Sequence, residues 1–257
     1  MASAHVQKLL GRLDAIGRSL ADTGQGLALL GLGSVGVERD RLDDYSDLDF
    51  FAIVAPGSGQ RFLSTLDWLT DIHPVVFHFR NTHDGYKLLY ADGVFCEFAV
   101  FEPAQLAGIP FAAGKVVWQA DGFDPALLTP APPRTPDPLT HSVDFHLGEA
   151  LSNLYVGLGR ERRGERLSAF KFIQEYALDH ALELAHLAET PTAAHADPFS
   201  VSRRFEARYP ETAAQLAAFA QGYAYNRESA RAILGWLDAH FEVNAGMKAR
   251  ILALSEG

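Results

Sequence analysis

The chain has 257 residues, enough for one large domain or two modest domains, each with its own core. Hydrophobic residues make up 48% and charged residues 21%, as in ordinary soluble globular proteins, and no apolar run approaches the ~18 residues of a membrane span. The formal net charge of -10 argues against nucleic acid as a general partner, because binding the phosphate backbone requires a basic surface; it favours cationic small molecules instead.

The first half of the sequence alternates predicted strands and helices. An apolar stripe with helical spacing predicts a first helix over 3–22, ended by a glycine-rich breaker. The hairpin over 86–101 turns at Ala91-Asp92-Gly93, and its second strand is apolar on both faces, which is typical of a central, buried strand. The remaining predicted elements are strands at 27–32, 47–54, 75–80 and 115–119 and a helix at 61–69.

The second half of the sequence reads as helical. A proline-rich stretch over 121–139 precedes it and is interrupted by apolar residues, so we expect an ordered linker. Predicted helices follow at 141–160, 165–189, 199–207, 210–220 and 227–254. The expected fold class is α+β: a small mixed β-sheet domain with flanking helices at 1–120, the linker, and a C-terminal helical bundle domain at 140–257.

The stretch from Leu27 to Val54 carries the chemistry. A Gly33-Ser34 turn follows its first strand, and Asp47 and Asp49 open its second. Residues two apart on a strand project from the same face, so the two carboxylates point together. Such a pair suits one or two Mg²⁺ ions, which prefer oxygen ligands and complete their shell with substrate phosphates. Glycine lets a phosphate approach the turn closely.

This stretch resembles the signature of the nucleotidyltransferase superfamily, whose fold is like that of DNA polymerase beta. The family pattern is Gly-Ser, a connector, and Asp-x-Asp in a hydrophobic strand, matched here by Gly33, Ser34, Asp47 and Asp49. Antibiotic nucleotidyltransferases of this superfamily have a mixed-sheet catalytic domain followed by a helical bundle. The resemblance implies transfer of a nucleoside monophosphate, AMP from ATP as the first expectation among nucleoside triphosphates, to a hydroxyl of an aminoglycoside or lincosamide.

Glu97 is the one charged residue in the apolar strand that ends at Phe101. By the resemblance it is a third carboxylate beside the aspartates, serving either as a metal ligand or as the base that accepts the proton of the attacking hydroxyl. The competing interpretation is a structural ion pair with an arginine. The sequence leaves these roles open.

Two basic residues are candidate phosphate contacts. Lys171 resembles the helical-domain lysine that contacts nucleotide phosphates in related enzymes, although a surface lysine on an amphipathic helix explains it equally well. Many family members carry an arginine shortly after the serine; here Arg39 stands later in the connector and is the candidate replacement.

Other site types find little support. His73, His78 and His83 fit no common zinc spacing, and the single cysteine, Cys96, excludes a cysteine zinc site and reads as a core residue. We expect a cytoplasmic enzyme without a membrane partner, and a homodimer stays open because some related enzymes build their sites across two chains. The alternatives are a protein or metabolite acceptor, a nucleotide-binding regulator without turnover, and a sugar transferase.

Overall fold

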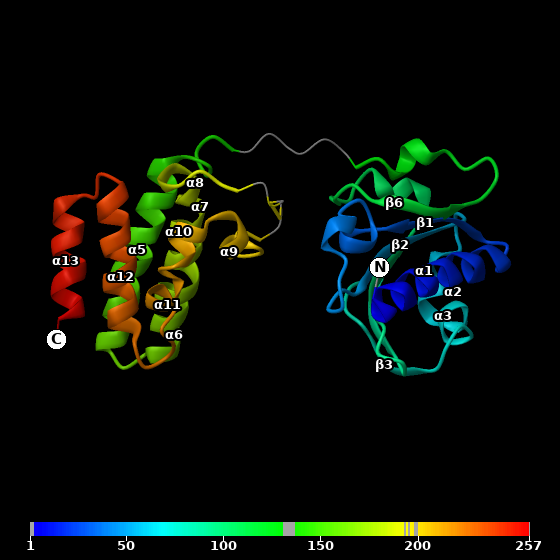
Figure 1. Ribbon diagram of the computed structural model, residues 1–257, viewed down its shortest axis with the longest axis horizontal. Coiled ribbons are helices and arrows are strands. Elements are labelled where there is room, and N and C mark those ends of the chain that lie inside the picture. The colour runs from blue at the N-terminus through cyan, green and yellow to red at the C-terminus, as the bar shows by residue number, and fades with distance from the viewer. Residues whose placement is uncertain (1–2, 131–136, 193, 195, 198–199, 257) are drawn as a thin grey trace. The chain divides into compact units, whose positions relative to one another are not determined.

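The computed structural model describes residues 3–130, 137–192, 194, 196–197 and 200–256. It forms two compact units, Met1–Pro133 and Arg134–Gly257, coloured from blue to green and from green to red in Figure 1. Their boundary falls inside the segment 121–139 that was expected to be a linker. Residues 131–136 of that segment lie outside the described residues. Each unit is described here by itself.

The first unit is built on a six-stranded mixed sheet with the order β3-β4-β5-β2-β1-β6. The strands are β1 (Gly26–Gly31), β2 (Leu48–Val54), β3 (Val75–Arg80), β4 (Gly85–Tyr90), β5 (Phe95–Phe101) and β6 (Lys115–Gln119). Neighbours pair antiparallel except β2 and β5, which are parallel. The predicted strands and the central position of the strand ending at Phe101 are confirmed.

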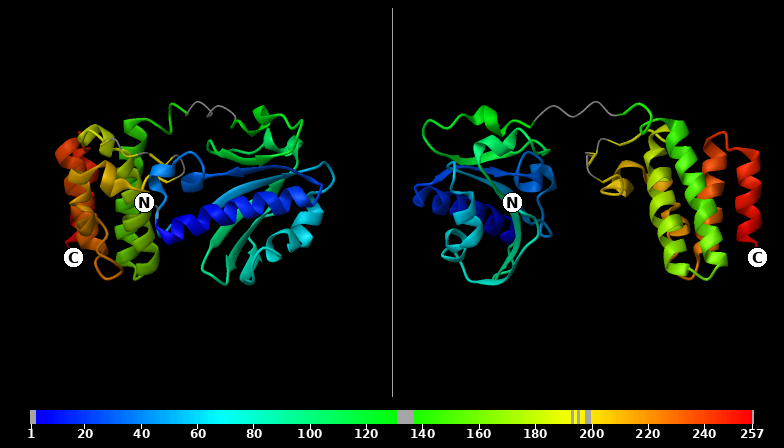
Figure 2. Two further views of the ribbon diagram at one scale, coloured as in Figure 1. Left: turned by 45° about the vertical axis from the view of Figure 1, so that its right-hand side comes forward. Right: turned by 180° about the vertical axis from the view of Figure 1, so that it is seen from behind.

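Helix α1 (Ala4–Asp22) covers one face of this sheet, as Figure 2 shows from two sides. Its apolar stripe is fully buried, and each such leucine or isoleucine contributes about 1.5–3 kcal/mol to stability. The stripe consists of Leu9, Leu13, Ile16 and Leu20. The Ser3 hydroxyl starts the helix by accepting a hydrogen bond from the Val6 N–H at 3.1 Å. The predicted helix at 3–22 is therefore confirmed.

The opposite face of the sheet carries a smaller core. Helix α4 (Pro103–Leu106) and the 3-10 turn η3 (Pro125–Leu128) contribute Leu106 and Leu128 to it. The sheet contributes Ala28, Leu30, Ile53 and Phe101. The start of the proline-rich stretch thus packs against the first unit through Leu128.

The predicted helix at 61–69 is wrong as a single element. The chain forms two short helices, α2 (Gly59–Ser64) and α3 (Asp67–Thr70), because Thr65 is extended, with φ -132° and ψ 111°. Arg61 bridges the break by donating to both carboxylate oxygens of Asp67, at 2.8 and 2.7 Å. This ion pair and the buried Trp68 stabilise the bend between α2 and α3.

The second unit is helical in the described residues. Its elements are α5 (Val143–Arg162), α6 (Arg166–Phe170), the π-helical turn η4 (Lys171–Ala177), α7 (Leu178–Glu183), α8 (Ala185–Ala188), α9 (Phe205–Arg208), α10 (Pro210–Ala213), α11 (Leu216–Phe219), α12 (Asn226–His240) and α13 (Ala245–Ser255). Figure 1 shows α5, α12 and α13 running alongside one another, and they are in contact. Where α5 crosses η4, a Cβ at Gly157 would stand 2.6 Å from Cγ1 of Ile173, so glycine permits this close packing.

Several predicted helices are shorter or divided. The segment 199–207 contains only α9, and 198–199 lie outside the described residues. The segment 210–220 divides into α10 and α11. The segment 227–254 divides because Asn244 starts a new helix, its side chain accepting from the Met247 N–H at 3.0 Å.

A buried polar network joins η4 to α12. The Gln174 side chain donates to Oδ1 of Asn226 at 2.8 Å and to the Gly222 carbonyl at 2.9 Å, and it accepts from the Gly222 N–H at 2.8 Å. Asn226, 1% exposed, donates to Glu161 of α5 at 2.8 Å. Because each polar atom in this network has a partner, the network fixes how three helical segments meet.

Within the described part of the chain, every helix is too short or too polar to cross a lipid bilayer.

Replacing Asn226 with alanine should destabilise the second unit. The change removes one buried partner each from Gln174, which keeps Gly222, and from Glu161, which keeps Arg166. A lost buried hydrogen bond that leaves a group less satisfied costs about 1–3 kcal/mol. Urea denaturation of the full chain measures the loss. The control, Asn153→Ala, removes contacts made only to Glu149 on an exposed stretch of α5 and should change the unfolding free energy by less than about 0.5 kcal/mol. Equal effects of the two changes would contradict the role of the network.

Candidate active site

The Gly33-Ser34 turn lies directly against the strand that carries the aspartates. After β1 ends at Gly31, residues 33–35 form a 3-10 turn, η1 (Gly33–Val35), and the Leu32 N–H donates to the Asp49 carbonyl at 2.8 Å. Gly33 has φ +52°, and a Cβ built on it would stand 3.4 Å from Oδ2 of Asp49. Glycine therefore serves here both the backbone conformation and the close approach to a carboxylate.

The two aspartates flank a buried leucine. Strand β2 begins at Leu48, so Asp47 directly precedes the strand instead of opening it as expected. Leu48 is fully buried, while Asp47 and Asp49 are both partly exposed. This alternation places both carboxylates on the side of β2 away from Leu48.

Glu97 is the register partner of Asp49 across the parallel pairing of β5 with β2. Next to it, Cys96 and Phe98 are buried in the core beneath α1, so Glu97 projects from the opposite face, as Asp49 does. Neighbouring strands lie about 4.7–4.9 Å apart, which places the bases of these two side chains side by side. The structure thus brings together the turn, the aspartates and Glu97.

The Glu97 carboxylate already has two partners that the sequence analysis missed. Its Oε1 accepts from Nδ2 of Asn81 at 3.0 Å, and its Oε2 forms an ion pair with Nζ of Lys87 at 3.0 Å. Lys87 is the register partner of Glu97 on β4. The ion pair expected of a purely structural Glu97 is therefore present, with a lysine in place of an arginine.

Cys96 is a core residue. It is fully buried, and burial raises the pKa of its thiol well above the usual value, with Asp47 and Asp49 contributing in the same direction. A thiol of this kind stays protonated near neutral pH and is a poor nucleophile. The expectation that Cys96 belongs to the core is confirmed.

The aspartate pair suits a magnesium ion. Among the described residues, no three His, Cys, Asp or Glu side chains are arranged as a metal cluster. Mg²⁺ does not require one, because it commonly binds through one or two carboxylates and takes its other oxygens from substrate phosphates and water. Asp47 and Asp49 are partly exposed, and their carboxylates are of the kind that Mg²⁺ binds.

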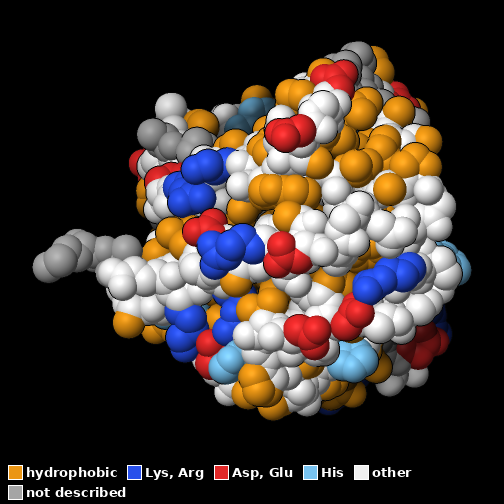
Figure 3. All heavy atoms as spheres, turned by 90° about the vertical axis from the view of Figure 1, so that its right-hand side faces the viewer, with side chains coloured by type: hydrophobic (Ala, Val, Ile, Leu, Met, Phe, Trp, Pro, Cys, Tyr) orange, Lys and Arg blue, Asp and Glu red, His pale blue; other side chains and the backbone are white. Residues whose placement is uncertain are grey.

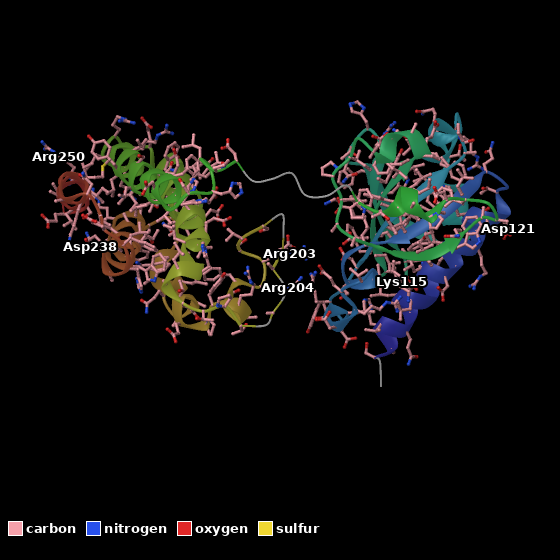
Figure 4. The ribbon with its side chains drawn as sticks, turned by 90° about the horizontal axis from the view of Figure 1, so that it is seen from above. Lys115, Asp121, Arg203, Arg204, Asp238 and Arg250 are labelled. Carbon is pink, nitrogen blue, oxygen red and sulfur yellow. The ribbon has the colours of Figure 1, made fainter. Side chains whose placement is uncertain are left out.

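Arg39 and Lys171 line other pockets, each within its own unit. Arg39 is exposed in the turn η2 (Arg39–Arg41) and lines a cavity of about 290 Å³ with residues of α1 and β6; none of the three carboxylates lines it. Lys115, at one side of this cavity, is labelled in Figure 4. Lys171 belongs to the second unit, where it is exposed at the start of η4 and lines an open pocket of about 510 Å³. The phosphate contacts expected of Arg39 and Lys171 stay predictions.

The surface charges are mixed on the face that Figure 3 presents. Lys and Arg side chains there alternate with Asp and Glu, and hydrophobic side chains lie between them. A surface of this kind differs from the continuous basic footprint that binds a phosphate backbone.

No protein-family model and no curated protein matches the chain. Among solved structures, the chain is similar to the crystal structure of an aminoglycoside 6-adenyltransferase from Bacillus subtilis, with 15% sequence identity and a TM-score of 0.31 over 95% of this chain and 95% of that chain. A similarity this low does not establish a shared activity.

Proposed function

We propose that the chain is a Mg²⁺-dependent nucleotidyltransferase that transfers a nucleoside monophosphate, AMP from ATP, to a hydroxyl of a small molecule. The observation that carries this proposal is the position of Asp49. One of its carboxylate oxygens lies 3.4 Å from where a Gly33 Cβ would stand, and its backbone is in register with Glu97. The Gly33-Ser34 turn, the two aspartates and a third carboxylate thus lie near the starts of two neighbouring central strands, β2 and β5.

Each group has a role in this proposal. Asp47 and Asp49 would hold the Mg²⁺, and the bound ion neutralises negative charge that develops on the phosphates. Ser34 is partly exposed in the turn beside Asp49, so its hydroxyl and backbone N–H can approach the phosphate oxygens. The acceptor oxygen forms a bond to the α-phosphorus, the bond to the pyrophosphate oxygen breaks, and pyrophosphate leaves.

Glu97 has two candidate roles. As a base it accepts the proton of the attacking hydroxyl; as a third ligand it joins the aspartates on the metal. Either role needs only one carboxylate oxygen, so Asn81 or Lys87 can hold the other oxygen in both cases.

Aminoglycoside or lincosamide antibiotics are the acceptor class that we propose. Two observations support it: the resemblance of the Leu27 to Val54 stretch to antibiotic nucleotidyltransferases, and the formal net charge of -10, which favours a cationic acceptor.

A pyrophosphate-release screen tests the proposed function. Purified full-length protein is assayed with each nucleoside triphosphate against a panel of aminoglycosides, spectinomycin and lincosamides, with and without Mg²⁺. We expect release that requires both Mg²⁺ and an acceptor. Binding of UDP-sugars but not of ATP would indicate a sugar transferase. Nucleotide binding without release for any small molecule or protein acceptor would indicate a regulator.

Asp49→Asn should reduce kcat/KM by at least about a hundredfold, because the side chain loses the charge that holds the metal while keeping its size. Steady-state pyrophosphate release measures this loss. Asp121→Asn, at the exposed position labelled in Figure 4, changes the net charge equally and should leave turnover unchanged. Normal turnover in Asp49→Asn would rule out the assigned site.

Glu97→Gln separates the two roles of Glu97. If Glu97 is the base, kcat should fall by about 10²–10⁴-fold while the Kd of the Mg²⁺-nucleotide complex is retained. If it is a metal ligand, the Kd should rise as well. Calorimetry for binding and pyrophosphate release for turnover distinguish these results, and a variant unchanged in both would assign Glu97 to the Lys87 ion pair alone.

Gly33→Ala should lower activity by more than its effect on stability explains. A non-glycine residue at φ +52° costs about 1–2 kcal/mol, and the new methyl would also stand against Asp49. Gly24→Ala is the matched control, because Gly24 has φ +67° in the same unit and its Cβ would meet no atom within 4 Å. We expect similar losses of melting temperature in both variants and a loss of nucleotide affinity only in Gly33→Ala. Equal activities would contradict the role of this turn.

A further inference from the structure

Two histidines meet within the second unit. His146 lies on α5 and His180 on α7, two helices that are in contact and appear side by side in Figure 1. Their rings are tilted by 52° with centroids 5.3 Å apart, and the two Nδ1 atoms are separated by 3.1 Å. Both imidazoles are partly buried.

The separation of the two nitrogens is informative. A neutral pair can form one hydrogen bond, with one Nδ1–H donating to the other Nδ1. The same arrangement nearly satisfies a metal, because a tetrahedral Zn²⁺ with Zn–N bonds of about 2.0–2.1 Å holds two ligand nitrogens about 3.3–3.4 Å apart. Replacing the shared proton with a metal ion therefore requires only a small movement of the rings.

One phenylalanine packs against both imidazole rings. Phe145 makes edge-to-face contacts with both imidazoles, at centroid distances of 5.5 Å to His146 and 5.8 Å to His180. Packing against the same phenylalanine keeps the two rings next to each other, with their Nδ1 atoms 3.1 Å apart.

Carboxylates stand on the same side of each helix. Glu149 follows His146 by three residues on α5, and Glu183 follows His180 by three residues on α7, a spacing that places each pair on one helix face. All four side chains line one pocket of about 530 Å³. Among the described residues no three metal-binding side chains are already clustered, so a third ligand has to come from water or from rotation of an exposed glutamate.

We propose that His146 and His180 form a binding site for a transition-metal ion of the Zn²⁺ class, bound by their Nδ1 atoms, with Glu183 and water completing the tetrahedron. Imidazole nitrogens select Zn²⁺, Cu²⁺ or Ni²⁺, whereas Mg²⁺ prefers the oxygen ligands of Asp47 and Asp49. The site is independent of the proposed nucleotidyl transfer, since it shares no residue with it. It gives the helical unit a metal-linked stability.

A zinc titration of the metal-free, full-length protein tests the proposal. Millimolar Mg²⁺ is present throughout to occupy the aspartate pair, and a chromophoric chelator competes for Zn²⁺. We expect one Zn²⁺ per chain at this site. His146→Gln and His180→Gln should each weaken binding by at least about tenfold, since even partners that only orient a ligand cost 10–100-fold when removed. His240→Gln should bind as the wild type does, because His240 is exposed on α12 and bonds the Trp236 carbonyl.

A second measurement uses the wild type alone and so does not depend on the folding of a variant. The chain has ten histidines, and NMR of their ring C–H groups follows each imidazole during a zinc titration. Added Zn²⁺ should shift two of them before the others. Absence of such a pair of shifts, or unchanged zinc affinity in a folded His146→Gln or His180→Gln variant, would overturn the site. Neither result bears on pyrophosphate release.

Discussion

The parallel pairing of β2 with β5 is the interaction on which the candidate active site depends. On the α1 side of the sheet, Phe50 stacks on Phe98 with ring centroids 5.2 Å apart and an angle of 4° between the rings. On the other side, the same register puts Asp49 beside Glu97. A slip by one residue would turn the phenylalanines out of the core and the carboxylates into it, so core packing enforces the geometry of the site.

Much of this unit could be predicted from local sequence. Alternating and continuous apolar runs locate the strands, and the Gly33-Ser34 pair and the two aspartates stand at strand ends where their spacing alone is informative. The position of Lys87 opposite Glu97 could also be predicted. A hairpin turning at residues 91–93 pairs Tyr90 with Val94, and counting back along the two strands brings Lys87 opposite Glu97. The contact of Asn81 with Glu97 could not be predicted, because it depends on the path of the chain after β3.

The helical half shows where local pattern fails. The break between α12 and α13 contains no proline or glycine, and it occurs because Asn244 forms a helix start that competes with continuation. The π-helical turn η4 has no local signal either, and its Gln174 is held by distant Gly222 and Asn226. His146 and His180 are 34 positions apart, so only the packing of α5 against α7 brings them together. In the last two cases contacts between residues far apart in the sequence decide the structure.

The ion pair between Lys87 and Glu97 has a consequence for how the first unit exists before any ligand arrives. Three carboxylates near the starts of β2 and β5 repel one another. Proteins that rely on a bound cation to relieve such repulsion unfold when the cation is removed. Here the chain supplies its own counterion, an ammonium 3.0 Å from one carboxylate. Because this ammonium offsets one of the three negative charges, the carboxylates can lie close together with less repulsion than three uncompensated charges would have.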